Sequence, residues 1–255
     1  MINLLFYRFL RFFLKINYCV QVFVPYLKMH IFNKYLSTFA KLKQTIKKQT
    51  MKKIILVAVA IFFFGYTNAQ EAKFGIKAGL NLSNWAGDTD GLDIQSKAGL
   101  NIGGFVAIKL SDKITLQPEL LYSMEGTKVN NFQFDYQGSI YYVDASFNLS
   151  YINVPLMMKF YPTEKFNLEA GPQVGFLVSA KTVAKVNGNK GDDNVKDSFE
   201  SVNFGLNFGA AYDFTKNISA GVRYNFGLSN LAKTVAGDNT KIHGNVVSLS
   251  VGYSF

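Results

Sequence analysis

The sequence predicts an all-β fold, an eight-stranded antiparallel transmembrane up-and-down β-barrel that is preceded by a signal peptide. Three observations predict it: apolar and polar residues alternate along most of the chain, the connections between these runs alternate between short and long, and an export-like apolar segment stands before them. Hydrophobic residues make up 49% of the chain and aromatic residues 15%, a composition that excludes a disordered polymer.

The net charge of +10 comes from the first part of the chain. Residues 1–70 contain 11 Lys and Arg and no Asp or Glu, whereas residues 71–255 contain 16 basic and 17 acidic residues. The body of the protein therefore has no basic stripe, and we expect no nucleic-acid binding. The one cysteine, Cys19, excludes a disulfide framework and a Cys-rich zinc site.

Residues 51–69 have the pattern of a secretory signal peptide. A basic pair is followed by an apolar run that ends at Phe64, and Thr67 and Ala69 are small residues suited to cleavage after Ala69. The run is shorter than the roughly 20 residues of a spanning helix, which disfavours the alternative of a membrane anchor. Because signal peptides work at an amino terminus, residues 1–50 are interpreted as a mis-assigned upstream extension of the reading frame, with a genuine basic leader as the alternative.

Residues 70–255 are predicted to form the barrel domain. In one run Phe204 and Phe208 alternate with Asn203 and Asn207, and seven other runs have the same period. The runs match the about nine to eleven residues of a tilted spanning strand, whereas strands of soluble sandwiches have a mode near five or six. The eight predicted strands are residues 74–83, 100–110, 114–125, 151–160, 166–179, 201–213, 218–229 and 246–255.

The connections alternate in length, which is the asymmetry of outer-membrane barrels. Closure is required there because every backbone N–H and C=O in hydrocarbon needs an internal partner, and the apolar face then meets lipid. Pro118, Pro155 and Pro172 interrupt the strands, so we expect β-bulges at these prolines. The short connections are residues 111–113, 162–165 and 215–217, and the long loops are expected at about 84–97, 126–147, 182–200 and 230–244.

Six charged residues fall on the predicted lumen face: Lys77, Lys109, Glu119, Lys159, Glu169 and Arg223. The interior of an eight-stranded barrel is just wide enough for its side chains, and unpaired buried charges are costly. We therefore interpret the six as an ion-paired plug, in preference to a conduit for ions or small solutes. Glu119 and Arg223 are the pair most expected to meet.

Catalytic and metal sites have weaker support. His243, Ser248 and Asp238 form a conceivable hydrolase set, but nothing in the sequence fixes their geometry. The acidic clusters around Asp88 and Asp192 lack full EF-hand spacing and are interpreted as solvated loops. We therefore expect no catalytic residue, no metal site and no cofactor.

Several motifs follow one another along residues 73–255, among them GIKAGLN at 75–81, QPELLY at 117–122, YINVPL at 151–156 and the ending GYSF. In their order and spacing they resemble the outer-membrane β-barrel domain of the PorT or "porin family" group common in Bacteroidota. The resemblance implies an eight-stranded barrel in the cell outer membrane. The secretion role of the founding member is not carried over.

The last predicted strand alternates Leu249, Val251, Tyr253 and Phe255. This pattern resembles the carboxy-terminal signal read by barrel-assembly machinery, and the alternative is a plain lipid-facing strand end with an interfacial aromatic girdle. The expected partners are therefore outer-membrane lipid, the assembly machinery during biogenesis, and surface partners that contact the long loops. The barrel is expected to be a monomer.

The predicted function is that of a non-enzymatic outer-membrane barrel with a structural, surface-interaction or limited-permeability role. One alternative is a soluble secreted lipocalin-like barrel that binds an apolar ligand, and another is an outer-membrane hydrolase. The first alternative requires the apolar face to point inward, so the direction of that face separates it from the prediction.

Overall fold

A computed structural model describes residues 72–89, 92–136, 139–186, 189–233 and 240–255. The predicted upstream extension, residues 1–50, and the predicted signal peptide, residues 51–69, lie outside the described residues. No helix in this described part of the chain is long and apolar enough to cross a membrane.

The described residues form antiparallel strands and one short 3-10 helix, η1 (Lys196–Ser198). The strands are β1 (Ala72–Gly87), β2 (Asp93–Lys109), β3 (Ile114–Tyr136), β4 (Ser139–Phe160), β5 (Phe166–Val186), β6 (Asn189–Asn194), β7 (Val202–Asp213), β8 (Ile218–Gly227) and β9 (Ile242–Ser254).

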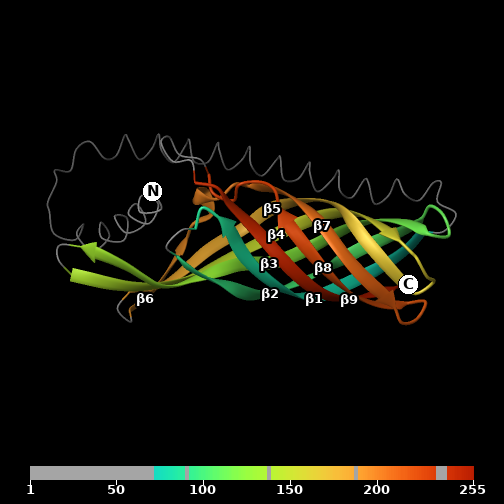
Figure 1. Ribbon diagram of the computed structural model, residues 1–255, viewed down its shortest axis with the longest axis horizontal. Helices are drawn as coiled ribbons and strands as arrows, with labels where there is room; N and C mark the ends of the chain where they lie inside the picture. Colours follow the sequence, from blue (N-terminus) through green and yellow to red (C-terminus); the bar gives the residue numbers. More distant parts are fainter. Residues whose placement is uncertain (1–71, 90–91, 137–138, 187–188, 234–239) are drawn as a thin grey trace, which may run out of the picture. The chain divides into compact units, whose positions relative to one another are not determined.

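Eight of these strands close into a barrel, as the sequence predicts. The hydrogen-bonded order is β4-β3-β2-β1-β9-β8-β7-β5, and the additional pairing of β4 with β5 completes the ring (Figure 1). β6 is a ninth strand that the prediction missed, and it pairs with β5 where β5 runs beyond β7. Every strand of the ring therefore has a neighbour on both sides, which satisfies the closure that hydrocarbon demands.

Three of the four expected long loops are largely extensions of strands, so this part of the prediction is wrong. β3 and β4 contain 23 and 22 residues and stay paired out to Tyr136 and Ser139. β5 continues to Val186 and turns back as β6. The physical reason is that a long hairpin satisfies its own backbone groups in water, and β-branched and aromatic residues such as Val129 and Val143 favour it.

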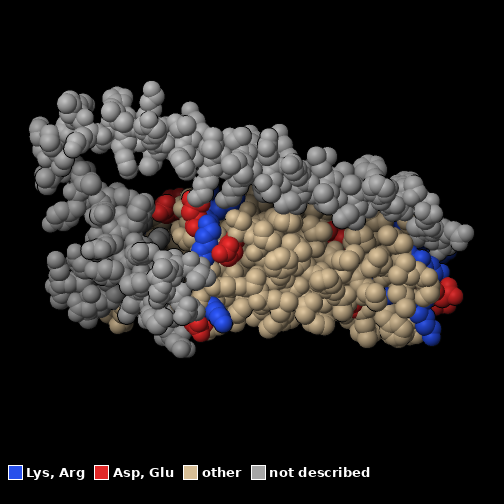
Figure 2. Space-filling model, turned by 90° about the horizontal axis from the view of Figure 1, so that it is seen from above, with Lys and Arg blue, Asp and Glu red and all other residues tan. Residues whose placement is uncertain are grey.

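The apolar face points outward and the polar face points into the lumen. Leu80 and Phe208 on the outside are 60% and 54% exposed, whereas Glu119 and Arg223 in the lumen are 0% and 8% exposed. Figure 2 shows the result on one face, where Lys, Arg, Asp and Glu gather toward the two ends of a broad surface of other residues. This orientation contradicts the lipocalin-like alternative, which needs an apolar lumen.

The expected bulges at the prolines are absent from the described ladders. The pairs Phe105↔Glu119 and Ile108↔Leu116 lie on either side of Pro118 and keep one register. The register shifts instead between Ser150 and Tyr151, and at two other places away from the prolines. Near each proline two adjacent pairs are missing from one ladder and no residue is added to the strand, which is a smaller disturbance than a bulge.

We predict that the Leu80→Arg variant lowers the free energy of unfolding by about 2–4 kcal/mol, because it puts a charge on the middle of the lipid-facing surface. The Ile218→Arg variant, at the first residue of β8, is the matched control and costs about 0–1 kcal/mol near the interface. Denaturant unfolding in lipid vesicles measures both. Equal losses for the two variants would contradict a depth-dependent lipid contact.

Candidate functional site

A buried ion network crosses the lumen near its middle. The Arg223 guanidinium donates from Nη1 and Nη2 to the two carboxylate oxygens of Glu119, each at 2.9 Å, and from Nε to Oε1 of Glu169 at 2.8 Å. Lys77 Nζ donates to Glu119 Oε1 at 3.2 Å, and Gln117 Nε2 donates to the same oxygen at 2.7 Å. Glu119 therefore has its charge and both oxygens fully matched, as a buried carboxylate requires.

The register of the strands brings these side chains together. Glu169 on β5 is paired with Gly209 on β7, and Gly209 is paired with Arg223 on β8. A Cβ at Gly209 would lie 2.6 Å from the Val222 carbonyl oxygen and 3.0 Å from Glu169 Oε1. The missing side chain thus leaves the inner face open for Glu169 to reach Arg223 across the intervening strand.

Five of the six predicted lumen charges lie in this network, and Lys109 does not. Lys159 Nζ lies 3.9 Å from Glu169 Oε2, whereas Lys109 pairs with Asp112 at 3.1 Å and its side chain is 45% exposed. The expectation that Lys109 joins the plug is therefore wrong. The reason is its position at the last residue of β2, where a long side chain reaches water at the rim.

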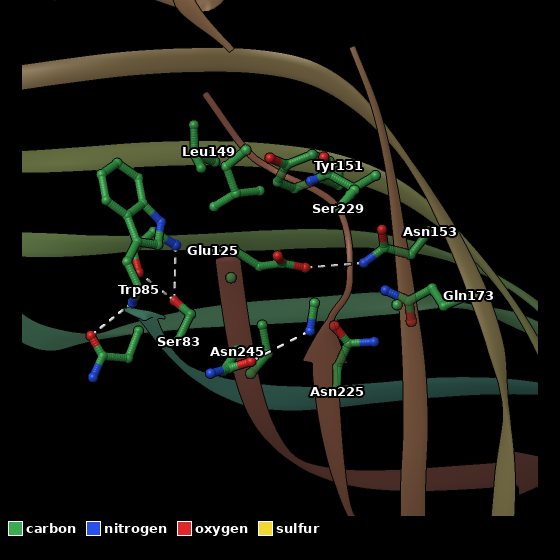
Figure 3. A pocket seen from close by; sticks show the side chains of 18 of the residues that line it. Ser83, Trp85, Glu125, Leu149, Tyr151, Asn153, Gln173, Asn225, Ser229 and Asn245 are labelled. Carbon is green, nitrogen blue, oxygen red and sulfur yellow. Dashed lines mark hydrogen bonds between the residues drawn. The ribbon is translucent and has the colours of Figure 1, made fainter. Parts of the chain in front are cut away.

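On the loop side of the ion network, the lumen is filled by amides, hydroxyls and one further carboxylate. Ser248 donates to Asn81 Oδ1 at 2.8 Å, Asn81 donates to Ser123 at 2.8 Å, and Ser123 donates to Glu125 Oε1 at 2.8 Å. Asn153 adds a second bond to Glu125 at 3.0 Å, visible in the cavity of Figure 3. This cavity has a volume of about 30 Å³, which is room for water and little more.

Aromatic and aliphatic side chains cap the lumen at the end opposite the short turns. Trp85 on β1 stacks at 4.8 Å from Phe147 on β4 and at 5.7 Å from Phe199, measured between ring centroids. The buried members of this apolar cap are Leu149, Tyr151, Leu177, Ala180, Phe199 and Leu231. Leu149, Tyr151, Trp85 and Leu231 also line the small cavity, so the cap lies directly above the polar layer (Figure 3).

The sequence analysis missed this apolar cap. Phe199 and Leu231 come from the segments after η1 and after β8, which are held together by the bridge between Phe199 and Ala232 and by the hydrogen bond from Glu200 N to Leu231 O. The available signal was large apolar residues inside connections that are otherwise polar, which marks residues that fold back onto the barrel.

The conceivable hydrolase set is not assembled in the described residues. His243 Nδ1 lies 3.1 Å from the Ser229 carbonyl oxygen, and Ser248 donates to Asn81 inside the lumen. Positions 243 and 248 are an odd number of residues apart along β9, so their side chains point to opposite faces. Asp238 lies outside the described residues. Among the residues that are described, no group of three or more His, Cys, Asp and Glu is placed to hold a metal ion.

Three residues of the predicted assembly signal lie on the outer face of β9, and the fourth, Phe255, directly follows its last residue. Leu249, Val251, Tyr253 and Phe255 all have exposed side chains, and the rings of Tyr253 and Phe255 meet edge to face at 5.5 Å. This placement suits contact with lipid or with another protein during assembly.

A family model described as "outer membrane protein beta-barrel domain" matches residues 68–233. No curated protein matches the chain at a significant level. The match covers more than half of the chain and spans all strands of the barrel except β9.

Several solved structures have a similar course of the chain. Ail, the attachment invasion locus protein of Yersinia pestis, is 16% identical, with a TM-score of 0.45 over 73% of this chain and 100% of its own. Neisserial surface protein A is 15% identical, with a TM-score of 0.43 over 73% of this chain and 100% of its own. OprG from Pseudomonas aeruginosa is 13% identical, with a TM-score of 0.37 over 74% of this chain and 98% of its own.

We predict that the Arg223→Met variant lowers the free energy of unfolding by about 3–5 kcal/mol, because two buried carboxylates lose their shared cation. Lys109→Met is the matched control, and it changes stability by less than about 1 kcal/mol because its ion pair is exposed. Unfolding in lipid vesicles measures both variants. A loss for Arg223→Met no larger than that of the control would refute the network as a structural element.

Proposed function

The chain belongs to the outer-membrane protein β-barrel family, and from this premise we propose that it is a sealed barrel that carries a surface-exposed extension for contact with partners outside the cell. It is a protein of the cell outer membrane. The proposed role is structural and interactive, without catalysis and without steady conduction of solutes.

The observation that carries the sealed state is the bidentate contact between Arg223 and Glu119, which spans the lumen from β8 to β3. An ion that crosses this layer has to displace matched charges, and it then meets the apolar cap around Trp85 and Phe199. The two layers oppose permeation by different means, since one holds fixed charges and the other excludes water.

The surface role is supported by strands that are longer than a membrane needs. A spanning strand takes about nine to eleven residues, so about half of β3 is left over, roughly 40 Å at about 3.3 Å for each residue. In this extension β4 pairs with β3, β5 with β4 and β6 with β5, and Figure 1 shows β6 at the end of the barrel away from the short turns. Long loops and extensions of such barrels face the outside of the cell, which makes this sheet the available contact surface.

Three finer points of this proposal rest on sequence. The ordered motifs support membership of the PorT or "porin family" group, and residues 51–69 support export through a signal peptide. The exposed row that ends at Phe255 supports recognition by barrel-assembly machinery. The barrel is proposed to work as a monomer, because the described ring satisfies all of its strand edges within one chain.

Planar lipid bilayers test the seal. We expect no steady single-channel current from the wild-type protein, because each of the two layers blocks the lumen. Removal of one layer, by Trp85→Ala with Phe199→Ala or by Glu119→Ala with Arg223→Ala, leaves the other layer closed. Large, steady wild-type currents would refute the sealed barrel.

Cysteine labelling tests the orientation. The predicted mature chain has no cysteine, so Lys190→Cys on β6 and Lys113→Cys in the short turn after β2 each supply one site. A membrane-impermeant maleimide applied to intact cells is expected to label the Lys190→Cys variant alone, and to label both variants after the outer membrane is permeabilised. Labelling of the Lys113→Cys variant on intact cells would contradict the proposed topology.

A further inference from the structure

A further cavity lies at the short-turn end of the barrel, below the ion network. Its volume is about 240 Å³, eight times that of the cavity beside Glu125. We call it the periplasmic vestibule, because short turns of outer-membrane barrels face the periplasm. The charged residues that line it are Lys73, Lys109, Lys159, Lys216 and Asp213.

The charge of the vestibule is strongly unbalanced. Among the described residues that line it, four ammonium groups face a single carboxylate, that of Asp213, and Lys109 forms an ion pair with Asp112 at the rim. Lys73 and Lys216 are exposed at the mouth, whereas the Lys159 side chain is 8% exposed and forms part of the inner wall. The vestibule is therefore a cationic hollow with its most buried cation at its inner end.

The ion network above the vestibule also carries an excess positive charge, and it shares Lys159 with the vestibule wall. It contains three cations, Lys77, Lys159 and Arg223, and two carboxylates, Glu119 and Glu169. Arg223 is matched by three hydrogen bonds and Lys77 by one. Lys159 is the most weakly matched cation, since its one printed ion-pair contact, with Glu169 Oε2, measures 3.9 Å.

Lys159 lacks a hydrogen bond to any described residue. Its contact with Glu169 Oε2 measures 3.9 Å, beyond hydrogen-bond distance, and that oxygen also has no hydrogen-bond partner among the described residues. An ammonium carries three donors, and one long ion-pair contact leaves them open to further acceptors. A partner from solution that brings negative charge and acceptor oxygens would satisfy Lys159, and the vestibule is the space that gives it access.

We propose that the periplasmic vestibule binds a small free oxyanion of the phosphate type, with Lys159 as its innermost ligand. Such an anion supplies several acceptor oxygens and neutralises the excess charge of the network and of the vestibule wall. Lys73 and Lys216 at the mouth raise the local concentration of anions and complete the set of cationic ligands. The hydroxyls of Thr115 and Ser219, which also line the cavity, can donate to further oxygens.

Calorimetric titration of the purified full-length barrel in detergent with inorganic phosphate tests the proposal, at constant ionic strength held with chloride. We expect saturable binding to one site by the wild type. The Lys159→Gln variant is expected to weaken binding at least tenfold, since it removes the buried charge and keeps a similar side-chain length. The matched control, Lys113→Gln, removes an exposed lysine that does not line the vestibule and is expected to stay within twofold of the wild type.

Heat-modifiable migration in gels verifies that each variant is folded before it is titrated. If Lys159→Gln does not fold, Lys73→Gln replaces it and is expected to weaken binding severalfold by loss of a mouth cation. The absence of saturable phosphate binding by the wild type overturns the proposal. Unchanged affinity of the folded Lys159→Gln variant, or of Lys73→Gln where it is used, overturns it as well. These binding measurements do not depend on bilayer currents, so they test the anion site independently of the sealed barrel.

Discussion

An eight-stranded ring leaves room inside for its own side chains and little else, and this limit governs the lumen of the protein. A long residue on one strand has to extend over a small residue on the next. The Glu169 side chain passes over Gly209 to contact Arg223. The ring of Phe105 likewise lies over Gly75, and a Cβ at Gly75 would be 2.2 Å from the Phe105 Cζ atom. These two glycines thus leave the space that a charged and an aromatic side chain occupy.

The same narrow lumen is layered by polarity along its axis. The cationic vestibule is followed by the ion network, then by amides and hydroxyls around Glu125, and then by the apolar cap. Each layer is held by a different interaction, since the network pairs charges, the amides form chains of hydrogen bonds, and the cap buries aromatic rings against one another. The bond between Asn81 and Ser123 belongs to a chain that runs from β9 to β3 without a charged group before Glu125.

The sequence predicts the barrel because lipid imposes the period of two on every spanning strand, and Phe204 or Leu80 is assigned to the correct face from that period alone. It also predicts that Glu119 and Arg223 meet, since inward charges in a narrow barrel have few other partners. The alternation of residues does not indicate how far a residue lies from the end of the barrel. Lys109 was therefore assigned to the plug although it lies at the rim. The long strands β3 to β5 and the cap were missed for a different reason. The polar residues of these connections indicated loops and masked the β-branched and large apolar residues among them. The bridge of Phe199 with Ala232, which holds the cap segments together, joins distant positions and leaves no local pattern.

The position of the weakly matched charge follows from the cost of desolvation. Arg223 and Glu119 are each five residues from the short-turn ends of β8 and β3, and there the match is complete. Lys159 is one residue from the end of β4, where its ammonium borders the vestibule. A cation in the middle of the lumen without a partner would shift the balance against folding by several kcal/mol, whereas the same cation at the edge of the vestibule keeps access to water and to anions. The excess charge of the network is therefore stable only at the end of the barrel that opens to solution. The ion network that seals the lumen thus also places a cation at the entrance of the vestibule.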